Sequence, residues 1–171
     1  MAEELELEVI RVKLKSWFES KLPQDSKLVL APLKTPGTGQ NLKETFFIEL
    51  QWQQGGETMQ ENLVIRWPPR GFSVSPKYAY NMKKQYTLLD RLWDTVVPVP
   101  HVRWLEEDES VLGVPFYIVE RVPGWVPGDF PPFHIAGPLF EATAEEKTRI
   151  WWNAVDTIAN IHTLDWERKQ A

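Results

Sequence analysis

Apolar residues recur at intervals of three and four positions in three segments of the chain, which is the spacing of one face of an α-helix. The first segment covers residues 3–22 and the second covers residues 76–93. The third begins at Thr143, where Glu146 completes a capping box, and it runs to about Thr163. The sequence therefore predicts three helices. The apolar stripe of the first comprises Leu7, Ile10, Leu14, Trp17 and Phe18.

Apolar and polar residues alternate in "TFFIELQW", residues 45–52, as they do in a strand with one buried face. Gly55 and Gly56 follow in "QQGGET", and adjacent glycines supply the positive φ angles of a tight hairpin turn. The chain returns as a strand in "NLVIRW", residues 62–67. Short apolar runs predict three further strands, at residues 27–33, 101–106 and 115–122.

Two segments rich in glycine and proline separate these elements. Residues 34–44 are predicted to be a loop, and residues 123–142 a linker with a helical turn near 135–141. The resulting order is helix, three strands, helix, two strands, linker and helix. It predicts an α+β fold: a five-stranded antiparallel sheet with one packed helix, an N-terminal helix, and a C-terminal helix after the linker.

The composition narrows the classes of function. The 171 residues carry a net charge of −5, so a nucleic-acid partner held through its phosphates is not expected. The sequence has no cysteine, which excludes disulfides and thiolate metal sites, and its isolated histidines indicate no metal centre. No apolar run approaches the roughly 20 residues of a membrane span, and the acidic start lacks the layout of a signal peptide. We expect a cytoplasmic protein without a membrane partner.

Four segments carry a resemblance to a known family. They are "LVIRWPPRG" (63–71), "QYTLLDRLWDTVVPVPHV" (85–102), "EDESVLGVPFYIVERVPG" (107–124) and "EEKTRIWWNAVDTIANIHTLDW" (145–166). In this order and spacing the chain resembles the nucleotide-binding N-terminal lobe of the protein-kinase-like fold, in the aminoglycoside phosphotransferase (APH) family. It is similar to the branch that includes the kinase-like domains attached to some acyl-CoA dehydrogenases.

The resemblance implies where ATP would bind. In this fold ATP lies between a β-rich lobe and a helical lobe, and adenine hydrogen-bonds to the backbone of the strand that joins them. That strand is "YIVERVPG" here, which implies adenine contacts at the backbones of Glu120 and Val122, with Val119 behind the base. Arg66 is at the position where family members hold the phosphates with a lysine or arginine. From the residues alone, a strand that runs into a turn and a solvated arginine explain the same pattern.

Two positions match the family less closely. The phosphate-binding cation usually pairs with a glutamate of the next helix, and that position is Gln85, which can hydrogen-bond to a guanidinium but cannot neutralise it. The glycine-containing loop that covers the phosphates corresponds to "PGTGQNLKETF", with Gly37, Gly39 and Asn41 as candidates. A plain hairpin loop also explains that glycine pattern.

The residues that transfer a phosphoryl group in this fold are not found in the sequence. They are a catalytic aspartate, an asparagine after it and a metal-binding aspartate, and all belong to the helical lobe. His162 and Asp165 do not have the spacing of a catalytic loop, and Gln170 stands where the asparagine would be. We expect the Mg²⁺ ligands and the catalytic base to lie outside this chain, which should be inactive alone.

The sequence thus predicts a nucleotide-binding lobe at residues 1–122, with an N-terminal helix in 1–26. A hinge and linker follow at 123–142, and the first helix of a truncated helical lobe at 143–171. The predicted function is the ATP-binding lobe of a small-molecule phosphotransferase, which moves the γ-phosphoryl of ATP to a hydroxyl of an unidentified acceptor. One alternative is a non-catalytic nucleotide-binding or protein-interaction module, which a homodimer through an exposed lobe surface would suit. Another is a β-rich ligand-binding domain unrelated to kinases.

Overall fold

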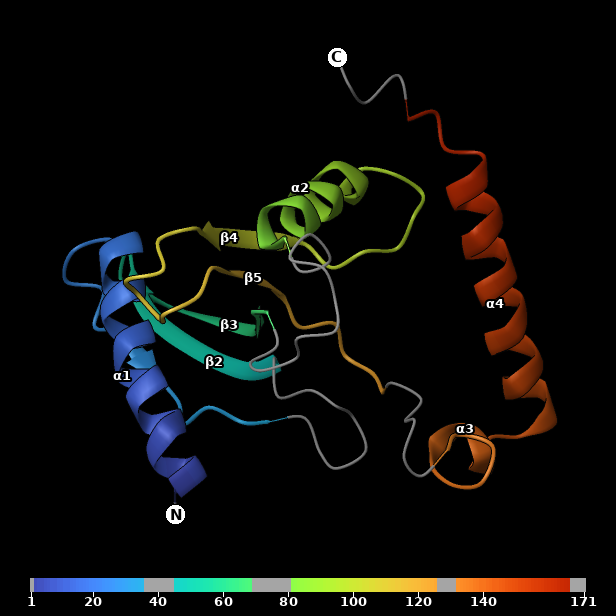
Figure 1. Cartoon of the computed structure of the whole chain (residues 1–171), viewed down its shortest axis with the longest axis horizontal. Coiled ribbons are helices and arrows are strands. Elements are labelled where there is room, and N and C mark those ends of the chain that lie inside the picture. The colour runs from blue at the N-terminus through green and yellow to red at the C-terminus, as the bar shows by residue number, and fades with distance from the viewer. Residues whose placement is uncertain (1, 36–44, 69–80, 126–131, 167–171) are drawn as a thin grey trace.

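Five strands and four helices make up the described part of the chain (Figure 1). In this computed structural model, the described residues are 2–35, 45–68, 81–125 and 132–166. The strands form one antiparallel sheet in the order β1-β2-β3-β5-β4. This arrangement confirms the predicted α+β fold. The elements are α1 (Ala2–Lys21), β1 (Val29–Leu30), β2 (Thr45–Gln54), β3 (Glu57–Arg66), α2 (Met82–Trp93), β4 (Val102–Glu106), β5 (Phe116–Glu120), α3 (Pro138–Glu141) and α4 (Ala144–His162).

The β2–β3 hairpin forms the centre of the sheet. Gly55 and Gly56 make its turn with φ angles of 62° and 87°, which residues with a side chain rarely adopt, so the predicted turn is confirmed. Pairing continues from the turn to the pair Thr45–Arg66. β3 therefore begins at residue 57 rather than at the predicted 62, because residues 57–61 pair through their backbone without an alternating apolar pattern.

Several other predicted elements are shorter in the structure, including β5, which covers residues 116–120 of the predicted 115–122. Regular pairing of β1 covers residues 29–30 within the predicted 27–33, and Lys34 adds an isolated bridge to β2. The second helix was predicted from residue 76, but α2 begins at Met82. Asn81 caps it, since its side-chain oxygen accepts a hydrogen bond from the Lys84 N–H at 2.8 Å. Residues 76–80 lie outside the described part of the chain.

One face of the sheet packs against α1. Leu14 and Phe18 are fully buried there, and the ring of Trp17 meets that of Phe116 edge-on with centroids 5.2 Å apart. Trp17 Nε1 also donates a hydrogen bond of 2.8 Å to the carboxylate of Glu106 at the end of β4. The predicted apolar stripe of the first helix is therefore confirmed as the face that packs on the sheet. The hairpin contributes alternate residues to this core: Phe46, Ile48, Leu50, Trp52, Leu63 and Ile65.

The opposite face of the sheet carries α2, which lies over β4 and β5 (Figure 1). Met82 of α2, Val102 of β4, and Tyr117 and Val119 of β5 form a second buried cluster. β5 is thus covered on both faces, which is why its apolar run is continuous rather than alternating. On β2 and β3, Thr45 is buried on this side, whereas four other residues that face it are half-buried or exposed: Phe47, Glu49, Val64 and Arg66.

α4 follows the single turn of α3, and its start agrees with the prediction. The Thr143 hydroxyl accepts a hydrogen bond from the Glu146 N–H at 3.2 Å, and the Glu146 carboxylate accepts one from the Thr143 N–H at 2.8 Å. Figure 1 shows α4 standing apart from the sheet, and none of its residues is buried. Among the described residues, no helix is long and apolar enough to cross a membrane.

Candidate functional site

Arg66, the last residue of β3, lies on the sheet face that α2 partly covers. In the sheet register it stands opposite Thr45 of β2 and Tyr117 of β5, and directly opposed residues project from the same face. The three side chains therefore form a row across three strands. Arg66 is exposed, and within the described residues no ion pair joins its guanidinium to a carboxylate. A cation in this setting is available to an anionic ligand.

Tyr117 connects this row to α2. Its side chain is buried, and its hydroxyl donates a hydrogen bond of 3.1 Å to Oε1 of Gln85. Burial raises the pKa of the Tyr117 hydroxyl, and the charge of the neighbouring Arg66 guanidinium opposes that shift. The hydroxyl thus lies beside both polar side chains that the sequence singled out on this face.

Tyr117 was not among the residues predicted from the sequence. A buried tyrosine hydroxyl usually requires a hydrogen-bond partner, and Tyr117 is the one polar residue in the apolar run "PFYIV". That signal indicates a hydroxyl that reaches a neighbouring element. The identity of the element depends on how α2 packs, because Gln85 lies 32 residues away in the sequence.

β5 ends at Glu120, and the chain leaves the sheet over the next two residues. The Glu120 N–H donates to the His101 carbonyl at 2.8 Å, and the Arg121 N–H donates to the Asn62 carbonyl at 2.9 Å. Val122 is 64% exposed, and within the described residues its N–H donates to no backbone carbonyl. Within the described residues, the Val122 N–H is therefore available to donate a hydrogen bond to a ligand.

Phe47 and Val64 form an apolar patch beside this exit. They stand opposite each other on β2 and β3, and Val64 stands opposite Val119 of β5, which is buried against α2. The guanidinium of Arg121 lies over the Phe47 ring, 4.0 Å from its centroid. A cation at this distance is attracted to the face of an aromatic ring. The Arg121 side chain therefore covers the aromatic part of the patch.

A charged pair borders the same patch. Lys34 Nζ lies 2.6 Å from Oε1 of Glu49. The hydrogen bond from Lys34 and its charge lower the pKa of Glu49, and the charge of Arg121 adds a smaller effect in the same direction. Because Lys34 is paired with a carboxylate, its charge is less available to a ligand than that of Arg66.

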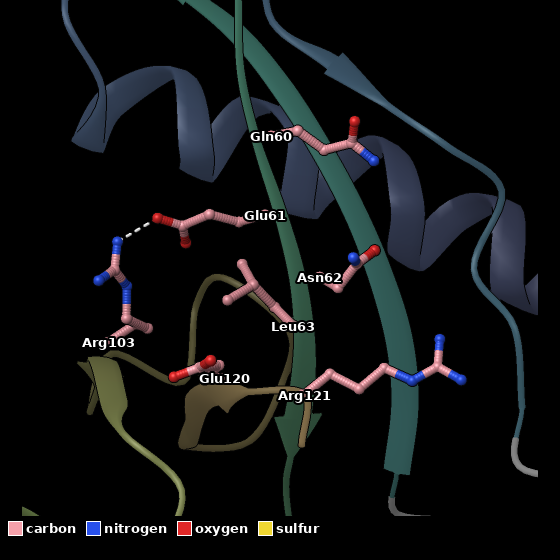
Figure 2. Close-up of a pocket in the computed structure, with 7 residues that line it drawn as sticks. All are labelled: Gln60, Glu61, Asn62, Leu63, Arg103, Glu120 and Arg121. Atoms are coloured by element: carbon pink, nitrogen blue, oxygen red, sulfur yellow. Dashed lines mark hydrogen bonds and ion pairs between the residues drawn. The ribbon is translucent and has the colours of Figure 1, made fainter. Parts of the chain in front are cut away.

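A pocket of about 340 Å³ opens along β3 beyond the end of β5 (Figure 2). Figure 2 shows Glu61 directed toward Arg103, with which it forms an ion pair. Two glutamates and two arginines line the pocket, so their formal charges cancel, and the lining does not favour a polyphosphate. Its lining includes no residue of the row formed by Thr45, Arg66 and Tyr117, so the pocket is a separate feature from that row. It is lined by Gln60, Glu61, Asn62, Leu63, Arg103, Glu120 and Arg121.

The remaining candidates lie either outside the described residues or on and after α4. Gly37, Gly39 and Asn41 lie outside the described residues. His162 is the exposed last residue of α4, and Asp165 is exposed after it. Across the described ranges, no three potential metal-ligating side chains gather at one place. Of the predicted positions, the structure places Arg66 and Gln85 beside one hydroxyl, and Val119, Glu120 and Val122 at the end of β5.

Known proteins resemble this chain in sequence and in fold. The model of the phosphotransferase enzyme family (APH) matches residues 47–170. Acyl-CoA dehydrogenase family member 10 from Mus musculus is 33% identical over 121 residues, which are 71% of this chain and 10% of that protein. Acyl-CoA dehydrogenase family member 11 from the same organism is 28% identical over 155 residues, 89% of this chain and 18% of that protein. The chain thus spans less than a fifth of these curated relatives.

A solved structure agrees with the family match. It is the crystal structure of a candidate aminoglycoside phosphotransferase from Ralstonia eutropha, which is 26% identical and superimposes with a TM-score of 0.52. The match covers 92% of this chain and 39% of the other chain. The matched part of this chain therefore corresponds to less than half of that protein.

Proposed function

This chain belongs to the phosphotransferase enzyme family, and from that premise we propose that its β-rich part is the ATP-binding lobe of a small-molecule kinase. The observation that carries the proposal is the position of Arg66. Its exposed guanidinium ends β3 on the sheet face beside α2, and no described carboxylate pairs with it. Phosphoryl-transfer enzymes need a fixed cation of this kind over the triphosphate.

We propose that adenine binds where β5 leaves the sheet. Within the described residues the Val122 N–H donates to no backbone carbonyl, and Glu120 precedes it on the same stretch, so the two backbones can offer a donor and an acceptor to the edge of a base. Val119 would lie behind the base. The apolar patch of Phe47 and Val64 suits the flat face of a purine, since aromatic rings stack on bases of any sequence.

We propose that Gly37, Gly39 and Asn41 cover the phosphates and that Gln85 supports Arg66 from α2. The nucleotide-binding lobe would then be residues 1–122, followed by a hinge and linker at 123–142 and the first helix of a second lobe at 143–171. The matched part of the solved relative is 39% of its chain. We place the catalytic base, the Mg²⁺ ligands and the site for the acceptor hydroxyl in the part of such a protein that has no counterpart here.

Calorimetric titration of the chain with ATP and with adenosine tests this function. We expect ATP to bind more tightly than adenosine, because Arg66 contacts only the phosphates. Arg66→Ala should weaken ATP binding by about tenfold or more, as expected for the loss of a charge-assisted contact, and should leave adenosine binding unchanged. Lys15→Ala is the control, since Lys15 is half-exposed on α1, on the other face of the sheet. If ATP does not bind, or if Arg66→Ala has no effect on ATP binding, the proposal is wrong.

The alternative, a non-catalytic module, is favoured by one further observation. α4 exposes a series of apolar side chains, including Trp151 at 68%, Ile158 at 54% and Ile161 at 50% exposure, and such surfaces often mark protein interfaces. A phosphotransferase assay distinguishes the two functions. The longest natural chain that contains these residues should transfer phosphate from ATP if the first proposal holds. Nucleotide binding without turnover by that chain would favour the module.

A further inference from the structure

We propose that Tyr117 is a positioning residue, whose hydroxyl links Gln85 on α2 to Arg66 on β3 and holds the guanidinium ready for nucleotide phosphates. This inference rests on the proposed role of Arg66 and extends it to a residue that does not itself contact the nucleotide. It also assigns a role to Gln85, which replaces the glutamate that the family resemblance implies at this position.

The position of the hydroxyl is fixed by packing. The side chain of Tyr117 is 4% exposed and belongs to the cluster formed with Met82, Val102 and Val119. Side chains in such a cluster have little freedom to change rotamer. The backbone opposite is also fixed, because Arg66 is the register partner of Tyr117. The hydroxyl is therefore a rigid point next to a long side chain that is otherwise exposed.

The direction of the hydrogen bonds allows the link. A phenol has one proton to donate and lone pairs that can accept. The Tyr117 proton goes to Oε1 of Gln85, at 3.1 Å, so the lone pairs of the oxygen are left for an N–H of Arg66. Arginine has five N–H donors in a planar group, and one bond to the hydroxyl leaves the others for phosphate oxygens.

The neutral link differs from an ion pair in its electrostatic effect. A glutamate at position 85 would hold the guanidinium but would also cancel much of its charge. Gln85 and Tyr117 are both neutral when they hold it, so the full positive charge of Arg66 remains for the ligand. The replacement at position 85 therefore leaves the cation supported, and it changes the support from a charge pair to a hydrogen-bonded relay.

Two substitutions remove the link from its two ends. Tyr117→Phe deletes the hydroxyl but keeps the buried ring, and Gln85→Met deletes the acceptor on α2. We expect each variant to bind ATP about three- to tenfold more weakly than the wild type, as for the loss of one hydrogen bond. Adenosine binding should stay unchanged, because only the phosphate contact depends on the link. The double variant should bind ATP no more weakly than either single variant, because all three variants break the same link.

Tyr86→Phe is the matched control. Tyr86 is a half-buried tyrosine of α2 that packs on the same cluster, so its substitution removes a phenol hydroxyl from similar surroundings without touching the link. ATP and adenosine should bind this variant as they bind the wild type. Thermal unfolding of each variant establishes that it is folded, and Gln85→Met still tests the link if Tyr117→Phe does not fold.

The outcomes separate this inference from the proposed function. Loss of ATP affinity without loss of adenosine affinity in both single variants supports the relay. The relay is overturned if the wild type binds ATP and both variants bind it equally well, or if adenosine affinity falls in parallel with ATP affinity. A wild-type chain that binds no ATP overturns the proposed function, and the relay with it.

Discussion

Arg121 is the residue whose position the sequence suggested least. It lies directly after β5, where the resemblance implied backbone contacts to adenine, and its own side chain drew no prediction. In the structure its guanidinium stacks on Phe47, 4.0 Å from the ring centroid, on the patch where we propose that the base lies. A base and a guanidinium cannot occupy the same face of one ring. We therefore expect Arg121 to leave the ring when a nucleotide binds.

Arg121→Ala tests whether this contact competes with the base. An exposed cation–π contact is worth about 0.5–1 kcal/mol, so its removal should tighten adenosine binding by about two- to fivefold, measured by calorimetry. Arg121→Lys is the control, because it keeps the charge near Glu49 but lacks the planar group. Weaker adenosine binding in the alanine variant would mean that Arg121 stacks on the bound base rather than competing with it.

At the scale of elements, the contact between α1 and the sheet depends on a polar link as well as on apolar packing. Glu106 at the end of β4 accepts a hydrogen bond from Trp17 Nε1 at 2.8 Å and lies 3.3 Å from Lys21 Nζ. The Trp17 hydrogen bond lowers the pKa of Glu106 most, followed by one from the Asp108 N–H. Burial opposes these effects, and Lys21 adds to them. One carboxylate thus joins the end of α1 to the β4–β5 hairpin.

This lowered pKa predicts how stability depends on pH. The ionised Glu106 stabilises the folded state above the ordinary pKa of 4.5, and this contribution is lost as the pH falls below that value through the lowered folded pKa. Glu106→Gln should therefore reduce the free energy of unfolding by about 1 kcal/mol at pH 7. The difference from the wild type should shrink in acid. Urea denaturation at a series of pH values measures both.

Glu107→Gln is the matched control for this prediction. Glu107 is the next residue, and its ion pair with Lys83 is exposed on both sides, with 57% and 63% of the two side chains accessible. Exposed pairs contribute little, so this variant should unfold like the wild type at every pH. Equal effects of the two substitutions would contradict a specific role for Glu106.

At the scale of the whole molecule, α4 is the element that the rest of the described chain leaves uncovered. Its apolar stripe was predicted from the sequence, and its capping box is confirmed. None of its residues is buried, and Trp151, Trp152 and Ile158 are each more than half exposed. A helix with such a stripe is normally stabilised by packing, so we expect this face to find a partner in solution.

Sedimentation velocity tests that expectation. The chain should self-associate as its concentration rises, because association buries apolar surface. Trp151→Ser combined with Ile158→Ser should shift the equilibrium toward the monomer. Asn153→Ser is the control, since it changes an exposed polar residue of the same helix. A wild-type chain that stays monomeric at all concentrations would contradict the prediction and with it the proposed homodimer.

Most of the fold could be predicted because its signals are local. The stripe of α1, the glycines of the hairpin turn and the Thr143 cap each depend on residues within a few positions of one another. One error has a non-local cause, and the other comes from a local capping signal that the prediction did not use. Residues 57–61 are strand only because β2 pairs with them, and α2 starts at Met82 because Asn81 caps it.

The residues of the candidate site also differ in whether the sequence could point to them. The family resemblance identified Arg66, Gln85 and the end of β5 from their order along the chain. It could not identify Tyr117 or Arg121 as neighbours of these positions. The hydroxyl of Tyr117 meets Gln85 only after α2 has packed on β5, and Arg121 meets Phe47 only after β2 and β3 have paired.

The sequence by itself determined most of the elements and their order, because periodicity and turn residues are properties of neighbouring positions. The family came from a resemblance carried by the order of four longer segments. The tertiary structure decided which side chains meet across the sheet. The row of Thr45, Arg66 and Tyr117 joins strands that are separated by loops and a helix. Its chemistry therefore depends on register and packing, which many different residues fix together. That is why the family resemblance could draw attention to Arg66, whereas the hydroxyl opposite it became apparent only in the folded chain.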